Sequence, residues 1–176
     1  MRFETERLTL RPLDASDRDA YVDMFEAGAA VERWLPPMPE GDAFDAHFAR
    51  QLPSQTDQSV RLAGVTRGGE LAALVNLTEI VRGVFQNAYV GWRTHPRLLG
   101  QGYATEAVRG CLELAFRPQP QGLGLHRIQA NILPDNLASR RVAERCGMRE
   151  EGVARRYLLI RGEWRDHVMY ARTAEE

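Results

Sequence analysis

The chain has 176 residues, of which 44% are hydrophobic and 27% charged, and its formal net charge is −1. This length predicts one domain over residues 1–176 with a single sizeable core. The near-zero charge gives no electrostatic support for binding to nucleic acid or to an anionic membrane surface. All 23 basic residues are arginine, which excludes chemistry that needs a lysine Schiff base.

The cysteine and histidine patterns indicate the environment of the protein. Cys111 and Cys146 fall on apolar faces of predicted helices, which favours buried free thiols and a reducing compartment. We find no secretory signal and no apolar run long enough for a membrane span, so we expect a soluble, cytoplasmic protein. The four histidines have no metal-ligand spacing, and we expect no metal site.

The first half of the chain alternates strand and helix patterns. In chain order these predict a strand over 7–13, a helix from Asp14 or Ser16 to about Ala27, a break at Pro36-Pro37-Met38-Pro39, a helix over 41–52, and strands over 60–65, 71–80 and 88–92. The Gly68-Gly69 pair predicts a hairpin between two of these strands.

The second half begins with an amphipathic helix from Ala104, whose apolar residues fall at helical spacing on one face. The remaining patterns predict a loop over 118–124, a strand over 126–132, a helix from Asn136 that ends at Gly147, and strands over 148–159 and 163–171. Helices interspersed among strands predict a three-layer α/β domain around a mixed sheet.

Gly100 and Gly102 lie between the apolar strand and the amphipathic helix. Such a loop aims unpaired backbone N–H groups and a helix N-terminus at an anion, which indicates a phosphate-bearing ligand. A Walker loop would need a lysine, and a dinucleotide fingerprint would need Gly or Ala at the position of Thr105. An ordinary strand-to-helix turn is the alternative.

The spacing Arg97-x-x-Gly100-x-Gly102 resembles the pyrophosphate loop of the GNAT superfamily of N-acetyltransferases. Three further segments, residues 5–12, 131–152 and 161–172, resemble the RimJ/RimL branch of that superfamily in the same order. The resemblance therefore covers nearly the whole chain.

This resemblance implies a GNAT-like three-layer α/β/α domain with a mixed, mostly antiparallel sheet, splayed between the strand before the glycine loop and the strand after its helix. It also implies transfer of an acetyl group from acetyl-CoA to a primary amine in a ternary complex. The acceptor expected from the family is a protein N-terminus, as in ribosomal proteins. The alternatives are a small amine, such as an antibiotic or polyamine, and a non-enzymatic acyl-CoA-binding regulatory module. A homodimer is left open.

Two features bear on the acceptor. The acidic residues Glu26, Glu32, Glu40, Asp42 and Asp45 would suit a cationic acceptor, or would form a solvated helix face. Trp34 falls in a segment that lines the acceptor side in the family, and packing in the core is the alternative for this residue.

The resemblance assigns cofactor contacts to Trp92, Arg93, Arg97, Leu98, Leu99, Gly100, Gln101, Gly102, Tyr103, Ala104, Asn131, Asn136 and Ser139. We expect Arg97 to neutralise phosphate and a backbone N–H near Trp92 or Arg93 to serve the oxyanion. Ser139 is the predicted catalytic donor to the leaving thiolate, and Asn136 contacts the pantetheine arm. Helix capping alone is the alternative for these last two residues.

The sequence does not identify a single residue as the general base. The RimL-like pattern has a glutamate in the penultimate strand, and counting from Glu151-Gly152 places Leu158 there. Leucine cannot take a proton. Glu79, at the end of a strand, is the predicted substitute, although a solvated carboxylate is the simpler reading of that position. His126 and a chain of water molecules are the other candidates.

Overall fold

The computed structural model describes residues 2–27, 34, 39, 41–52 and 55–176. Its elements are β1 (Phe3–Glu4), β2 (Leu8–Pro12), η1 (Ala15–Asp17), α1 (Arg18–Glu26), α2 (Asp42–Gln51), β3 (Val60–Thr66), β4 (Leu71–Val81), β5 (Asn87–Thr94), η3 (Pro96–Leu98), α3 (Tyr103–Phe116), β6 (Arg127–Ile132), α4 (Leu137–Arg145), β7 (Arg149–Ile160) and β8 (Glu163–Thr173). The predicted elements are confirmed, and β1 is too short to show a period in the sequence. Glu32, Pro36, Pro37, Met38 and Glu40 lie outside the described residues.

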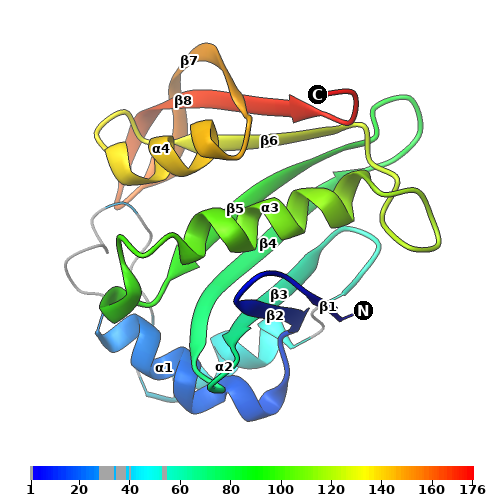
Figure 1. The fold of residues 1–176 in the computed structure, drawn as a ribbon. Coiled ribbons are helices and arrows are strands. Elements are labelled where there is room, and N and C mark those ends of the chain that lie inside the picture. Colours follow the sequence, from blue (N-terminus) through cyan, green and yellow to red (C-terminus); the bar gives the residue numbers. More distant parts are fainter. Residues whose placement is uncertain (1, 28–33, 35–38, 40, 53–54) are drawn as a thin grey trace.

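The strands form one sheet in the order β1-β2-β3-β4-β5-β6-β8-β7 (Figure 1). Neighbouring strands are antiparallel except β5 and β6, which are parallel. Helix α3 lies in the crossover between these two strands, as a parallel connection requires. The expected mixed, mostly antiparallel sheet is confirmed.

The sheet is splayed between β5 and β6. Only three residue pairs join the two strands, from Asn87 with Arg127 to Tyr89 with Gln129. Beyond them β5 continues to Thr94 and β6 to Ile132. In the described part of the chain, one edge of β5 therefore has no strand partner after Tyr89.

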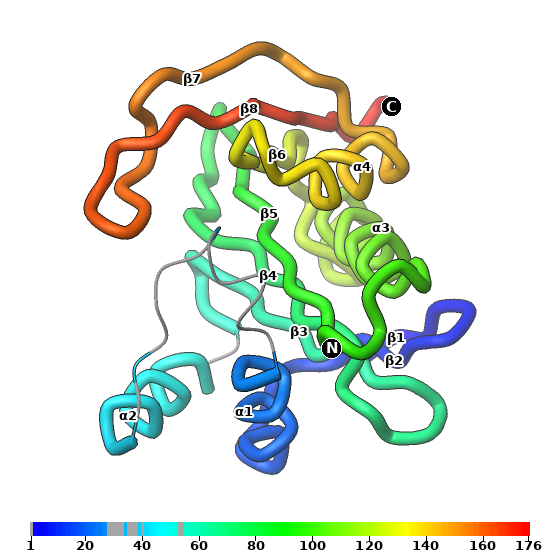
Figure 2. Tube along the Cα trace, turned by 90° about the vertical axis from the view of Figure 1, so that its left-hand side faces the viewer, coloured from blue at the N-terminus to red at the C-terminus, as the bar shows by residue number. Residues whose placement is uncertain are grey.

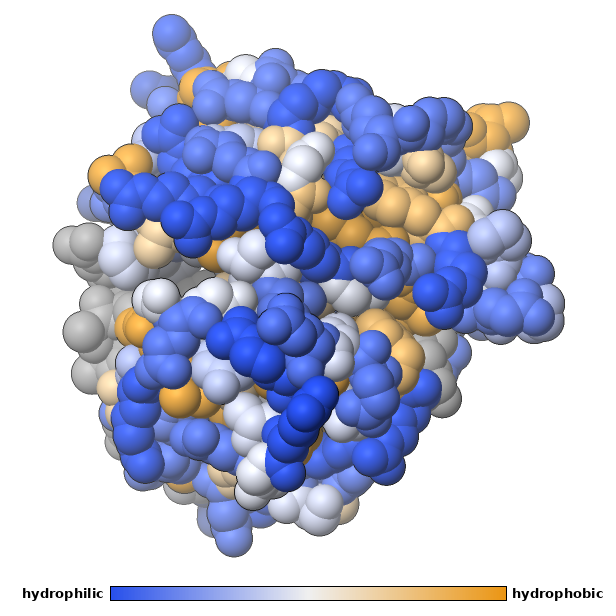
Figure 3. All heavy atoms as spheres, viewed as in Figure 1, coloured by the Kyte–Doolittle hydropathy of each residue, from blue (hydrophilic) through white to orange (hydrophobic). Residues whose placement is uncertain are grey.

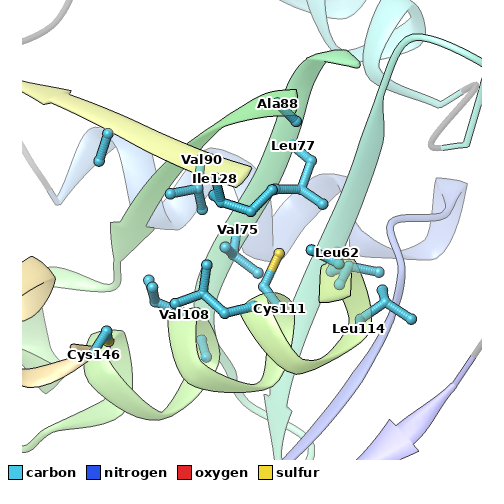
Figure 4. Packing of buried hydrophobic residues seen from close by; sticks show 14 of the residues in the cluster. Leu62, Val75, Leu77, Ala88, Val90, Val108, Cys111, Leu114, Ile128 and Cys146 are labelled. Atoms are coloured by element: carbon cyan, nitrogen blue, oxygen red, sulfur yellow. The ribbon is translucent and has the colours of Figure 1, made fainter. Parts of the chain in front are cut away.

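Helices cover both faces of the sheet, which gives the three expected layers (Figure 2). On one face α3 buries its apolar stripe, and Figure 4 shows Cys111 pointing toward Val75 of β4. On the other face α1 and α2 enclose a second cluster around Tyr21 and Phe48. Each such fully buried side chain stabilises the fold by roughly 1.5–3 kcal/mol. Among the helices that the structure describes, none combines the length and the apolarity of a membrane span.

Candidate active site

A cavity of about 390 Å³ opens between β5, the glycine loop (residues 99–102) and α4. The predicted cofactor contacts that line it are Trp92, Arg93, Leu98, Leu99, Gly100, Gly102, Tyr103, Ala104, Asn136 and Ser139. The other lining residues are Trp34, Thr94, Thr105, Ala138, Arg141, Val142 and Arg145. The structure thus brings the two predicted halves of the site, the glycine loop and the start of α4, to one cavity.

The glycine loop is built to receive an anion. Gly100 and Gly102 adopt φ of +76° and +86°, which favour glycine. No described residue is recorded as accepting a hydrogen bond from the backbone N–H groups of residues 102–105, and the N–H of Glu106 bonds to the Gly102 carbonyl at 3.0 Å. These unpaired donors and the positive end of the α3 dipole favour a bound phosphate.

Glu106 links the start of α3 to the N-terminal segment of the chain through hydrogen bonds. Its carboxylate accepts hydrogen bonds from Thr5 Oγ1 and the Arg7 N–H, both at 2.6 Å, and from Arg7 Nε at 2.7 Å. Arg7 Nη1 also donates to the Gln101 carbonyl at 3.0 Å, and the guanidinium lies 4.3 Å from the Tyr103 ring centroid. Burial raises the pKa of Glu106, but the bonds from Thr5 and Arg7 outweigh it and lower the pKa.

Arg97 does not line the cavity. Its Nη2 lies 2.7 Å from both carboxylate oxygens of Asp23 in α1. Buried His95 joins the pair, since its Nδ1 accepts the Arg97 N–H at 3.2 Å and its Nε2 lies 3.0 Å from Asp23 Oδ2. Nε2 therefore carries the proton and donates a hydrogen bond to the Asp23 carboxylate. Gln101 likewise lies outside the lining and donates to the Arg97 carbonyl at 3.3 Å.

Two lining arginines were missed by the motif reading. Arg141 and Arg145 lie one turn apart on α4, and no carboxylate of the described residues pairs with either. The end of α4 meets the start of α3, where Cys146 Sγ lies 3.5 Å from the Thr105 carbonyl oxygen and Arg109 Nη2 donates to the Arg145 carbonyl at 2.6 Å. Figure 3 shows the strongly hydrophilic surface over α4. The four-residue spacing of Arg141 and Arg145 can be read from the sequence. That both line the cavity depends on how α4 packs against α3.

The start of α4 is compatible with both roles predicted for Asn136 and Ser139, helix capping and contact with the cofactor. Asn136 Oδ1 accepts the Ser139 backbone N–H at 3.2 Å, so Asn136 caps the helix. The Ser139 hydroxyl takes no part in this bond, and the residue lines the cavity. The hydroxyl is therefore available to a ligand while the backbone completes the cap.

A chain of side-chain hydrogen bonds lies where β5 and β6 part. Asn131 Nδ2 donates to Tyr157 Oη at 3.3 Å, and Tyr157 Oη donates to Tyr89 Oη at 3.4 Å. We call these three residues the hydroxyl chain. Asn131, a predicted cofactor contact, thus bonds Tyr157 and is not among the lining residues. The bond to Tyr157, followed by burial, raises the pKa of Tyr89 to about 12.

Tyr157 occupies this place because β7 is irregular. Its register with β8 shifts between Ala154 and Leu158, and Arg156 has φ of +49°. Side chains therefore do not alternate regularly between the two faces along this part of β7. Tyr157 reaches Asn131, whereas Leu158 is 40% exposed.

The predicted substitute bases lie apart from the cavity lining. Glu79 is exposed in a bulge of β4 with φ of +51°, where the register with β5 shifts. Its charge contributes to the raised pKa of Tyr89, so the two groups interact electrostatically. His126 Nε2 pairs with Glu175 at 3.3 Å.

Neither cysteine is activated as a nucleophile. Burial raises the pKa of the Cys111 thiol to about 12 and that of Cys146 to about 11. Neither forms appreciable thiolate near neutral pH. In the part of the chain that the structure covers, no cluster of three His, Cys, Asp or Glu side chains could hold a metal ion.

Comparison with known proteins identifies the family. The model of the acetyltransferase (GNAT) domain matches residues 7–149. The Escherichia coli [ribosomal protein uS5]-alanine N-acetyltransferase is 30% identical over 185 residues, covering 100% of this chain and 92% of that protein. The Bacillus subtilis protein named "Probable N-acetyltransferase YjcK" is 42% identical over 101 residues, which are 57% of this chain and 54% of that protein.

A solved structure shows the same fold. Mycobacterium smegmatis RimJ in complex with CoA-disulfide superposes with a TM-score of 0.85 and 27% sequence identity, over 96% of this chain and 82% of that chain. The GNAT-like sheet and its splay, expected from the sequence, are therefore confirmed. With its glycine loop and the splayed strands, the chain belongs to the GNAT superfamily, in the branch of the RimJ/RimL ribosomal-protein acetyltransferases, and is an N-acetyltransferase.

Proposed function

We propose that this N-acetyltransferase moves the acetyl group of acetyl-CoA to the N-terminal amine of a protein, by direct attack in a ternary complex. The observation that carries the proposal is the single cavity that joins the unpaired N–H groups of the glycine loop to Ser139 beside the parting strands. The relative named for acetylating an alanine of uS5 supports this acceptor class.

The residues present fit coenzyme A. A Cβ at Gly100 would stand in open space, so the bare loop leaves room for a diphosphate beside its N–H donors. Arg141 and Arg145 supply positive charge from the α4 side, without a carboxylate partner in the described residues. Asn136 and Ser139 at the start of α4 would hold the pantetheine end. The coenzyme supplies an acetyl group activated as a thioester.

The chain's own groups then have three tasks. The unpaired edge of β5 offers the Trp92 backbone N–H to the acyl oxygen as it gains negative charge, whereas the Arg93 N–H faces β4. The Ser139 hydroxyl donates a hydrogen bond to the departing sulfur. The cavity holds the two substrates together, which supplies much of the acceleration.

Two further considerations favour direct transfer to an α-amine. The raised thiol pKa values of Cys111 and Cys146 leave no cysteine to form an acyl-enzyme. An α-amine has a pKa near 8, about two units below that of lysine, so more of it is neutral at physiological pH.

The test uses the purified protein, isotopically labelled acetyl-CoA and a cell lysate, with mass spectrometry of the products. Label on protein N-termini supports the proposal, whereas label confined to polyamines or other small amines overturns the acceptor class. Ser139→Ala should lower kcat while leaving acetyl-CoA affinity within about twofold, because the backbone cap is retained. An equal loss in both quantities assigns Ser139 to binding.

A further inference from the structure

We propose that the hydroxyls of Tyr157 and Tyr89 relay the proton that the acceptor ammonium must lose, in the place of the carboxylate base that Leu158 cannot supply. The inference rests on the proposed function and deepens it. It concerns the acceptor side of the reaction and includes one predicted cofactor contact, Asn131, as the hydrogen-bond donor to Tyr157.

The hydroxyl chain lies at the right point of the sheet. Tyr89 is the last residue of β5 that pairs with β6, so its side chain stands where the strands part. Ala88 and Val90 join the core under α3, and alternation therefore turns Tyr89 toward the opposite face. Gly91 shares this face two residues further on, beyond the last pair with β6.

The Asn76 side chain of β4 covers Gly91 on that face. Gly91 pairs across the strands with Asn76, and a Cβ at Gly91 would stand 3.0 Å from Asn76 Oδ1. Asn76 and Tyr89 thus present polar side-chain atoms on the same face of two paired strands. An amine that approaches β5 from this face meets hydrogen-bond acceptors before it reaches the strand.

The hydrogen bonds set the direction of transfer. Asn131 donates to Tyr157, and Tyr157 donates to Tyr89, whose own proton has no acceptor among the described residues. In the relay, an ammonium N–H bond breaks as an O–H bond forms at Tyr157. The Tyr157 proton moves to Tyr89 Oη, and the Tyr89 proton leaves to solvent on the side of exposed Glu79. The amine is left neutral for attack, and both phenols end as they began.

The surroundings of Tyr89 keep its hydroxyl protonated between turnovers. Hydrogen bonding to Tyr157, burial and the negative charge of Glu79 raise the pKa of Tyr89, against a smaller opposing effect of Arg127. His167, whose ring centroid lies 5.9 Å from that of Tyr157, has its pKa lowered mainly by burial. His167 is therefore neutral at pH 7 and does not compete for the proton.

Tyr89→Phe and Tyr157→Phe each remove one hydroxyl and keep the ring. Tyr21→Phe is the matched control, because it makes the same change in the second core, where Tyr21 Oη lies 3.5 Å from His47. Each protein is assayed with acetyl-CoA and a short peptide that begins with alanine, from about pH 6.5 to about pH 9. Isothermal titration gives acetyl-CoA affinity, and thermal melting confirms the fold.

The relay predicts a loss that depends on pH. Near pH 6.5 the amine arrives as an ammonium, so both variants should lose roughly 30- to 100-fold in kcat/KM for the peptide. Near pH 9 the amine arrives neutral, and the loss should shrink to within about threefold. Acetyl-CoA affinity and the Tyr21→Phe control should remain at wild-type values.

Other outcomes distinguish a failure of the relay from a failure of the proposed acceptor. A loss that is the same at every pH makes the tyrosines structural and overturns the relay, as does wild-type turnover in the variants. A wild-type protein that binds acetyl-CoA but acetylates no N-terminal amine overturns the proposed acceptor and the relay with it.

Discussion

Arg97 Nη2 donates to both carboxylate oxygens of Asp23, at 2.7 Å each, across 74 positions of sequence. The hydrogen bond from His95, with the charge of Arg97, lowers the pKa of Asp23, so the carboxylate is ionised near neutral pH. The residue predicted to neutralise phosphate thus already has an anionic partner on α1. Asp23 and a phosphate would compete for the same guanidinium.

This competition predicts that Asp23→Asn tightens acetyl-CoA binding by roughly threefold, the scale expected for an exposed ion pair. Asparagine keeps an acceptor for the His95 N–H while removing the charge. Isothermal titration at low and moderate salt measures the change. Asp19→Asn is the control, because Asp19 lies on the same helix and, among the residues that the structure describes, pairs only with Arg18, at 3.2 Å. Unchanged affinity in Asp23→Asn would show that Arg97 serves the loop's structure and does not bind phosphate.

Gly102→Val should abolish acetyl-CoA binding. The side chain would stand at φ of +86°, with its Cβ 3.3 Å from Arg7 Nη2, in the loop whose N–H groups we assign to the diphosphate. The backbone strain alone costs about 1–3 kcal/mol. Gly69→Val carries the same strain, since Gly69 has φ of +87° with nothing within 4 Å of its Cβ, but it lies in the β3–β4 turn. Comparable melting temperatures with loss of binding in Gly102→Val alone confirm the assignment; retained binding refutes it.

Glu106 should make stability depend on pH. Its folded-state pKa lies below its ordinary value of 4.5, so its contribution is complete above about pH 4.5 and is lost as the pH falls through the lowered pKa. Glu106→Gln, which imitates the protonated carboxyl, should lower Tm at pH 7 by roughly 2–8 °C, for about 1–2 kcal/mol of lost stability. The difference from wild type should narrow toward pH 3. Exposed Glu163→Gln is the control, and a Tm difference that stays constant with pH contradicts the linkage.

Local patterns were sufficient for the elements and for the glycine loop. The helical spacing of Ala107, Val108, Cys111 and their neighbours predicted the buried stripe of α3, and these side chains are fully buried. The loop between β5 and α3 follows from two glycines and the strand and helix that flank them. Signals of this kind lie within a few residues of one another.

The partners that shape the site are not local. Nothing in the sequence near Arg97 indicates Asp23, and the facing of Arg141 and Arg145 depends on how α4 packs against α3. Tyr157 escaped the sequence reading for another reason. The family pattern was followed by position from Glu151-Gly152 to Leu158, and the sequence does not show the register shift after Ala154 with which Tyr157 reaches Asn131.

That register shift yields a last prediction. If Leu158 occupied the place of the missing base, Leu158→Glu would restore a carboxylate and raise kcat. In the structure Leu158 pairs with Arg165 of β8 and is 40% exposed, whereas Tyr157 holds the position beside Asn131. We therefore expect Leu158→Glu to leave kcat and its pH profile within about twofold of wild type, as surface substitutions commonly do.

Val153→Glu places the same charge on β7 before the shift, where the side chain is 56% exposed, and serves as the control for added charge alone. Steady-state kinetics from about pH 5 to about pH 9 compare the two variants. A rise in kcat in Leu158→Glu alone, with a new limb near the pKa of a glutamate, would mean that position 158 does face the acceptor amine. Equal, wild-type behaviour of both variants would show that position 158 does not face the acceptor amine, as the relay through Tyr157 and Tyr89 requires.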